Sequence, residues 1–219
     1  MINIYFVNTY VYYKGGRVMD RIITIGREFG SGGRELGRRL AENLGYAYYD
    51  QEILAEIANR TELSEKYVQS IVERRPTFSY PIHVGHSFQP VINPAQDFGQ
   101  KIYLEQCDIL RELAEKSGCV IVGRCADYIL KDCNPFRVFV YADMDSKIER
   151  CRRKGRGQEN LTDKEMKRYI QDVDKHRARY YEFYTDQKWG DRKNYDICVN
   201  TTNEDIKKIA NILARLFRA

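Results

Sequence analysis

The strongest constraint on this chain is a strand-like run, a glycine-rich turn and a helix-like stretch within residues 21–44, RIITIGREFGSGGRELGRRLAENL. Ile22–Ile25 is β-branched, as is typical of a buried parallel strand. After the turn at 26–33, apolar residues recur at helical spacing. In this context the turn's backbone N–H groups and the positive end of the helix dipole can converge on an anion. We therefore expect a phosphate-binding turn, helped by Arg34; the alternative is a tight turn that binds nothing.

Composition limits the classes of protein to consider. The chain has 219 residues, which suits one α/β domain. Its net charge of +5 suits an anionic small-molecule ligand better than nucleic acid. It contains no run of about 20 apolar residues, so we expect no membrane span. Six cysteines without a CxxC pair indicate reduced thiols and a cytoplasmic location. Residues 1–20 are interpreted as an N-terminal extension, either an extra strand or residues upstream of a native start at Met19.

Strand and helix patterns alternate along the chain. After the first helix, strands are expected at 46–49, 119–122, 136–142 and 195–200, and helices at 53–58, 61–74, 98–116, 145–154, 162–185 and 204–218. Asp50 is expected to cap the helix that follows it, and Thr162 with Glu165 forms a capping-box pattern. The alternation predicts a parallel sheet with helices on both faces.

An irregular segment at 75–100 interrupts this alternation and holds four of the five prolines. A segment of this length inside a compact domain is typical of a functional lid or a mobile loop. His83 and His86 lie in it without a third ligand nearby, so the loop interpretation is preferred to a metal site. Gly123–Asp127 follows the strand at 119–122, at the edge of a parallel sheet where ligands bind.

Several motifs resemble the cytidylate kinase-like family, a branch of the P-loop nucleoside monophosphate kinases. They are REFGSGGREL (27–36), YYD (48–50), CVIVGRCADYIL (119–130), DKHRARYYEFYT (174–185), KWGD (188–191) and YDICVNT (195–201). The resemblance runs from Arg21 to the C-terminus. It implies a single three-layer P-loop domain at 21–219, with a helical acceptor-side insertion at about 60–105 and a lid at about 150–160. It also implies Mg²⁺- and ATP-dependent phosphoryl transfer to a nucleoside monophosphate, a pyrimidine such as CMP or dCMP.

The resemblance also implies roles for individual residues. The ATP phosphates would lie against Gly30, Ser31, Gly32, Gly33, Arg34 and Glu35. The acceptor would be bound by Asp50, Arg124, Asp174 and Arg177. The transferring group would be covered by lid arginines, Arg150, Arg152, Arg153 and Arg156, and the catalytic contacts are expected from Arg34, Arg152, Arg153 and Arg177.

The chain departs from the GxxxxGK[ST] motif at three positions. With Gly32 at the second glycine, Arg27 stands at the first glycine and Gly33 at the lysine. Arg34 is expected to supply the missing charge, although Arg27 or a lid arginine is an alternative source. Glu35 stands near the hydroxyl position and is the expected ligand of Mg²⁺. Arg124 resembles the arginine of the cytidylate kinase strand motif DGRD, and Cys125 stands where that motif has its second aspartate.

These departures leave two functions open. The first is an active kinase, and the second is a regulatory protein that binds nucleotide without turnover. A nucleic-acid module is disfavoured because no basic face with interleaved aromatics is seen, and a Rossmann dehydrogenase because Glu35 stands where the third glycine would be. The sequence leaves the oligomeric state open, and a homo-oligomer is compatible with it.

Overall fold

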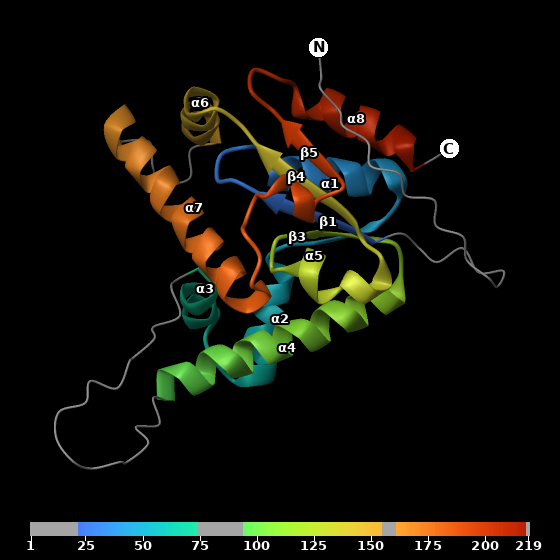
Figure 1. Ribbon diagram of the computed structural model, residues 1–219, viewed down its shortest axis with the longest axis vertical. Helices are drawn as coiled ribbons and strands as arrows, with labels where there is room; N and C mark the ends of the chain where they lie inside the picture. The colour runs from blue at the N-terminus through green and yellow to red at the C-terminus, as the bar shows by residue number, and fades with distance from the viewer. Residues whose placement is uncertain (1–21, 74–93, 155–160, 218–219) are drawn as a thin grey trace.

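The core of the protein is a sheet of five parallel strands (Figure 1). The computed structural model describes residues 22–73, 94–154 and 161–217, and for 94–98 only the backbone. The strand order is β2 (Ala47–Tyr49), β3 (Cys119–Val122), β1 (Ile22–Arg27), β4 (Phe136–Tyr141) and β5 (Ile197–Asn200). Every neighbouring pair is parallel, with Ile23 of β1 opposite Val120 and Phe136. The strands therefore end at one common edge, and the turn after β1 lies at its centre.

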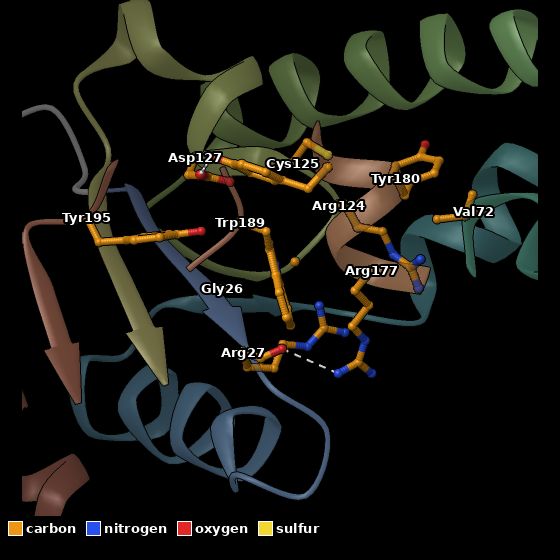
Figure 2. A pocket seen from close by; sticks show the side chains of 12 residues that line it. Gly26, Arg27, Val72, Arg124, Cys125, Asp127, Arg177, Tyr180, Trp189 and Tyr195 are labelled. Atoms are coloured by element: carbon orange, nitrogen blue, oxygen red, sulfur yellow. Dashed lines mark hydrogen bonds between the residues drawn. The ribbon is translucent and has the colours of Figure 1, made fainter. Parts of the chain in front are cut away.

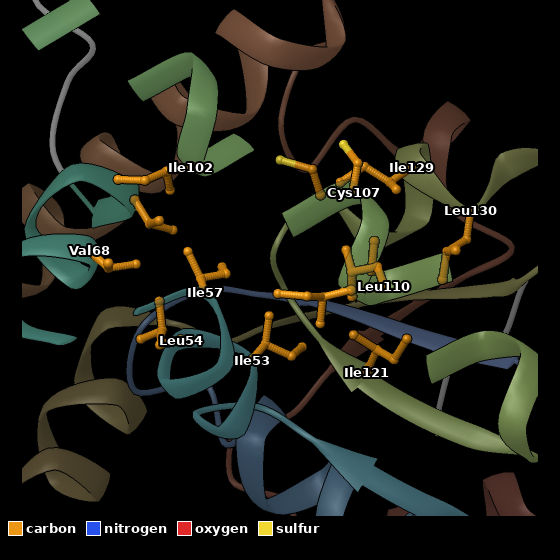
Figure 3. Packing of buried hydrophobic residues seen from close by; sticks show 14 of the residues in the cluster. Ile53, Leu54, Ile57, Val68, Ile102, Cys107, Leu110, Ile121, Ile129 and Leu130 are labelled. Atoms are coloured by element: carbon orange, nitrogen blue, oxygen red, sulfur yellow. The ribbon is translucent and has the colours of Figure 1, made fainter. Parts of the chain in front are cut away.

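Helices cover both faces of this sheet, which confirms the expected α/β fold. α1 (Gly33–Leu44) and α8 (Ile206–Leu216) pack on one face, where Ile23 and Ile25 are fully buried. α2 (Glu52–Thr61), α3 (Glu65–Glu73), α4 (Pro94–Lys116) and the short α5 (Ala126–Ile129) form the second core (Figure 3). Burying each such isoleucine contributes roughly 1.5–3 kcal/mol, so the two apolar faces of the sheet account for this layering.

Two further helices lie at the edge where the strands end. α6 (Met144–Lys154) follows β4, and α7 (Asp163–Thr185) runs along the edge (Figure 1). The predicted capping box is confirmed, because the Thr162 hydroxyl accepts from Glu165 N–H while the Glu165 carboxylate accepts from Thr162 N–H. Two short 3₁₀ segments, η1 (Lys131–Cys133) and η2 (Arg192–Asn194), complete the described elements.

The structure corrects three local predictions. The irregular segment expected at 75–100 ends earlier, because α4 begins at Pro94, a residue type that the first turn of a helix accommodates. The helix expected at 61–74 begins at Glu65, because Thr61 ends α2 and Glu62 turns into the left-handed region at φ 57°. The expectation that Asp50 caps α2 is wrong. Gln51 is the N-cap residue and makes no side-chain cap bond, while the buried Asp50 carboxylate is paired with Arg34.

Some predictions lie outside the described residues. These are the extension at 1–20, the part of the segment expected at 75–100 that covers 75–93 with His83 and His86, and the lid residues 155–160 with Arg156. Among the helices that the structure describes, none combines the length and apolar character needed to cross a membrane.

Candidate functional site

The glycine-rich turn between β1 and α1 is tightly packed. Gly30 and Gly32 adopt left-handed conformations, with φ +75° and +84°. A Cβ added to Gly30 would lie 3.0 Å from the carbonyl oxygen of Lys147, and one on Gly32 would lie 2.7 Å from Cδ1 of Ile206. Ser31 is fully buried, and its hydroxyl donates to the carbonyl of Glu28 at 2.8 Å. The turn therefore has the shape that only glycines allow at these positions.

Helices α6 and α7 hold the first half of this turn in place. The Asp174 carboxylate accepts a hydrogen bond from Phe29 N–H at 2.6 Å. Lys147 Nζ, almost fully buried, lies 3.1 Å from Asp174 Oδ2 and 2.7 Å from Glu28 Oε2. Burial raises the pKa of Asp174, although Phe29 N–H and Lys147 oppose the shift. Asp174 was predicted to contact the acceptor, and the structure places its carboxylate against the glycine turn.

A pocket lies beside the turn at the ends of β1 and β3 (Figure 2). Three arginines line it, Arg27 from β1, Arg124 after β3 and Arg177 from α7, and Figure 2 shows their guanidinium groups gathered on one side of Trp189. The other lining residues are Gly26, Val72, Gly123, Cys125, Asp127, Tyr180, Tyr181 and Tyr195. The predicted site residues Arg124 and Arg177 are thus brought together with Arg27.

This pocket has a surplus of positive charge. Burial lowers the pKa of Arg27, and the neighbouring charges of Arg177 and Arg124 lower it further. The carboxylate of Asp50 opposes the shift, with Oδ1 3.8 Å from Nη2 of Arg27. Guanidinium groups hold their charge, so the repulsion among them favours binding of an anion.

The backbone that carries Arg124 is strained. Gly123, Arg124 and Cys125 have successive φ values of 75°, 61° and 53°. For residues with a Cβ this conformation costs about 1–2 kcal/mol each. The buried Gln106 of α4 supports the turn, because its Nε2 donates to the carbonyl of Arg124 at 2.9 Å. Strain of this kind at a pocket is typical of a functional site.

Arg34 and Asp50 are joined by an ion pair beside Arg27. Arg34 Nε lies 2.5 Å from Asp50 Oδ2, and Tyr48 Oη donates to the carbonyl of Arg34 at 3.2 Å. The Asp50 carboxylate thus lies between Arg34 and Arg27. The guanidinium of Arg34 is thus directed to the Asp50 carboxylate. That Arg34 supplies the charge of the motif's lysine stays a prediction.

Glu35 is the predicted Mg²⁺ ligand, and its carboxylate is paired with cations. Its Oε1 lies 2.9 Å from Arg39 Nε, and its Oε2 lies 3.1 Å from Lys154 Nζ. Burial opposes ionisation, but the hydrogen bonds from these two cations outweigh it and lower the pKa of Glu35. Among the described residues there is no group of three or more His, Cys, Asp and Glu that could hold a metal.

The predicted lid arginines have different surroundings. Arg150 is buried, and its guanidinium donates to the carbonyl and hydroxyl of Thr201. Arg152 pairs with Asp163 at the start of α7. Arg150 and Arg153 both line a second hollow between α6 and the loop before α8. The structure therefore brings Arg150 and Arg153 to one hollow, while Arg152 is paired with Asp163 instead.

Sequence reasoning missed part of this site. Arg27 was predicted only as an alternative source of charge, and Lys147 was not predicted as a site residue. The signal that could have identified Arg27 is its position at the end of the first strand, in a motif that lacks its lysine. The burial of Lys147 depends on α7, which lies far away in the sequence.

A five-stranded parallel sheet, a glycine-rich turn after its central strand and a pocket lined by three arginines at its edge are features of a kinase-type nucleotide-binding phosphotransferase fold. The model of the cytidylate kinase-like family matches residues 22–203, and the chain belongs to this family.

Solved structures agree with this fold. The chain is similar to an uncharacterized protein from Eubacterium ventriosum ATCC 27560, at 28% identity and a TM-score of 0.66 over 91% of this chain and 99% of that one. It is also similar to shikimate kinase from Acinetobacter baumannii (18%, TM-score 0.51, 91% and 93%). A gluconokinase from Sinorhizobium meliloti 1021 is similar too (13%, TM-score 0.51, 91% and 95%). The comparison with curated proteins found no match.

Proposed function

We propose that the protein transfers the γ-phosphoryl group of ATP to a nucleoside monophosphate, a pyrimidine such as CMP or dCMP. The observation that carries the proposal is the convergence of Arg27, Arg124 and Arg177 in one pocket beside the glycine-rich turn. Phosphoryl transfer requires that spread negative charge be positioned and neutralised, with little covalent chemistry by the protein. A turn for the donor phosphates next to an arginine pocket for the acceptor phosphate meets that requirement.

Two hollows flank the turn, which matches a reaction with two substrates. The arginine pocket lies on the β3 side. The second hollow is lined by Arg150, Arg153 and Asn203 among others. It adjoins the turn because a Cβ on Gly32 would lie 3.9 Å from Cδ of Arg150. In this proposal the nucleoside part of ATP extends from the turn into the second hollow, and the acceptor occupies the arginine pocket.

The acceptor pocket has features that suit a base. Tyr180 and Trp189 line it beside the arginines, and an aromatic ring offers a flat apolar surface to a planar ligand. Tyr180 Oη is buried without a hydrogen-bond partner among the described residues. Figure 2 shows this hydroxyl directed away from the three guanidinium groups, so the ring and not the hydroxyl is proposed to contact the acceptor.

Mg²⁺ would neutralise phosphate charge when it is bound with ATP. It keeps several waters and needs only one or two protein carboxylates in addition to substrate phosphates. Glu35 stands on the first turn of α1 and Asp50 lies between Arg27 and Arg34, so these two are the proposed carboxylates. Both are paired with cations in the structure, and ligation would require them to exchange those partners.

The insertion and the lid are proposed to act on opposite substrates. Val72 of α3, in the insertion, lines the acceptor pocket, and α6 leads into the lid next to the second hollow. Amide hydrogen exchange at 75–100 and 151–160 should slow when ATP and acceptor bind together. All six cysteines are free in the structure, which supports the proposed cytoplasmic location.

An acceptor panel tests the proposal. ATP and Mg²⁺ are combined with CMP, dCMP, UMP, AMP and GMP, and with shikimate and gluconate because the similar solved structures include kinases named for those compounds. ADP release that requires CMP or dCMP supports the proposal. Release that requires only shikimate or gluconate keeps the kinase and overturns the nucleotide acceptor.

The second candidate function is nucleotide-dependent regulation without turnover. Gly33 at the lysine position favours it, since the motif's lysine normally reaches the β- and γ-phosphates. ATP binding by calorimetry with no acceptor-dependent ADP release from any member of the panel would select this function.

A further inference from the structure

The residue at the motif's lysine position is packed against another residue's side chain. A Cβ added to Gly33 would lie 2.5 Å from Cβ of Arg27 and 3.1 Å from its Cγ. Approaches below about 3 Å are not tolerated in a close-packed interior. The stem of Arg27 therefore fills the space into which a side chain at residue 33 would begin to grow.

The charged end of Arg27 lies where the two proposed substrates would meet. A Cβ on Gly123 would lie 2.8 Å from Cζ of Arg27, so the guanidinium lies against the backbone at the end of β3. Its Nη2 is 3.8 Å from Asp50 Oδ1, and its side chain is 12% exposed. Figure 2 shows it beside the guanidinium of Arg177, on the side of the pocket nearest the glycine-rich turn.

We infer that Arg27 supplies the cation that the motif's lysine would supply, and that Gly33 is small because the stem of Arg27 passes beneath it. This inference rests on the proposed function. The motif has glycine at the first position and lysine at the sixth after it; here the large cationic residue and the small one have exchanged places. A guanidinium is a planar fork that can bridge two phosphate oxygens, so it can reach both the donor's terminal phosphate and the acceptor.

Exchanging the two residues tests the inference. The proteins are the parent, Gly33→Lys, Arg27→Gly, the double variant, and Arg27→Met, which keeps the stem without the charge. ATP affinity is measured by calorimetry, folding by thermal unfolding, and turnover by ADP release. Gly33→Lys should unfold at a lower temperature because its side chain meets Arg27. Arg27→Met should stay folded and lose at least tenfold in ATP affinity.

The double variant is the decisive protein. It should recover ATP affinity to within about threefold of the parent, and it should unfold at a higher temperature than Gly33→Lys alone. Such strong non-additivity is expected only of residues that share one space. Arg38→Ala, on the exposed face of α1, is the matched control and should match the parent.

Other outcomes overturn the inference. Parental ATP affinity in Arg27→Met, with a raised acceptor KM, would assign Arg27 to the acceptor alone. A double variant no better than the worse single variant would show that the two residues do not exchange roles. Failure of the proposed function is visible separately, because the parent itself would then release no ADP with any acceptor while the affinity series could still be measured.

Discussion

Asp174 of α7 accepts a hydrogen bond from the backbone N–H of Phe29, a residue 145 positions away, at 2.6 Å. The same carboxylate lies 3.1 Å from Nζ of Lys147. A single side chain therefore joins α6, α7 and the glycine-rich turn. Its position makes the conformation of the turn depend on helices that begin more than a hundred residues later.

Replacing Asp174 should loosen this junction. Asp174→Ala leaves the nearly buried Lys147 with Glu28 as its remaining carboxylate partner and removes the acceptor for Phe29 N–H. Breaking a buried ion pair costs about 3–5 kcal/mol; because Glu28 remains, we expect a loss of about 2–3 kcal/mol in the free energy of unfolding. Urea denaturation measures it. Asp108→Ala, which removes the exposed pair with Arg111, should change stability by less than about 0.5 kcal/mol, and equal losses in the two variants would contradict the role of Asp174.

Gln106 is expected to affect function more than stability. Gln106→Leu removes the bond to the Arg124 carbonyl, which is worth about 1 kcal/mol. It also removes Oε1, which is buried without a partner among the described residues, so the two effects partly cancel. We expect a stability change of less than about 1 kcal/mol and, because the strained turn loses its support, an acceptor KM about tenfold higher.

The matched control for Gln106 lies on the same helix. Ile109→Val removes one methyl group from the core and should cost about 0.5–1.5 kcal/mol. It leaves the hydrogen bond from Gln106 to the Arg124 carbonyl in place, so acceptor KM should stay at the parental value. If both variants raise KM equally, general loosening of α4 explains the effect and Gln106 has no particular role.

Asp127 should make the stability of the protein depend on pH. Burial raises the pKa of Asp127, against the hydrogen bond from Tyr181 Oη. The folded state then binds the proton more tightly than the unfolded state does. Stability from this group is therefore greatest below the unfolded pKa of about 3.9 and falls as pH rises through the higher folded value.

Asp127→Asn removes this titration and keeps an oxygen that can accept from Tyr181. Relative to the parent, the variant should gain stability as pH increases from 4 to 7, measured by urea unfolding at unit intervals. Asp174 also has a raised pKa, so the variant should retain part of the parental slope. Asp132→Asn, at an exposed position, is the control. Parallel curves for the parent and Asp127→Asn would refute the assignment.

The parts of the fold that were predictable depend on local pattern. The β-branched run at Ile22–Ile25 and the capping box of Thr162 with Glu165 are each contained within a few residues, and the structure confirms both. The boundary between α2 and α3 was missed because the left-handed turn at Glu62 has no glycine to mark it.

The site was less predictable because its geometry is made by residues far apart in sequence. Arg124 and Arg177 were expected near one another, and they line one pocket. The pairing of Asp50 with Arg34 depends on how β2 lies beside β3, and the burial of Arg150 depends on the loop after β5. Neither relationship leaves a periodic pattern in the chain.

The contribution of Arg34 to catalysis is expected to be smaller from the structure than from the sequence. As the substitute for lysine it would contribute about 2–4 kcal/mol to the transition state, or 10²- to 10³-fold in rate. The structure joins its guanidinium to Asp50 at 2.5 Å, so part of its charge is already neutralised. Because we assign the lysine's charge to Arg27, we expect Arg34→Ala to lower acceptor-dependent kcat/KM by two- to tenfold, about 0.4–1.4 kcal/mol.

The comparison of Arg34→Ala with Arg27→Met under identical ATP and acceptor concentrations decides between these two arginines. A loss of 10²-fold or more in Arg34→Ala, together with a small loss in Arg27→Met, would make Arg34 the lysine substitute. In that case Arg34→Lys should recover only part of the rate, since the planar fork is lost. A large loss in Arg27→Met together with a small loss in Arg34→Ala would show that Arg27 supplies the charge of the motif's lysine. That charge would then come from the end of β1, where the stem of Arg27 lies beneath Gly33.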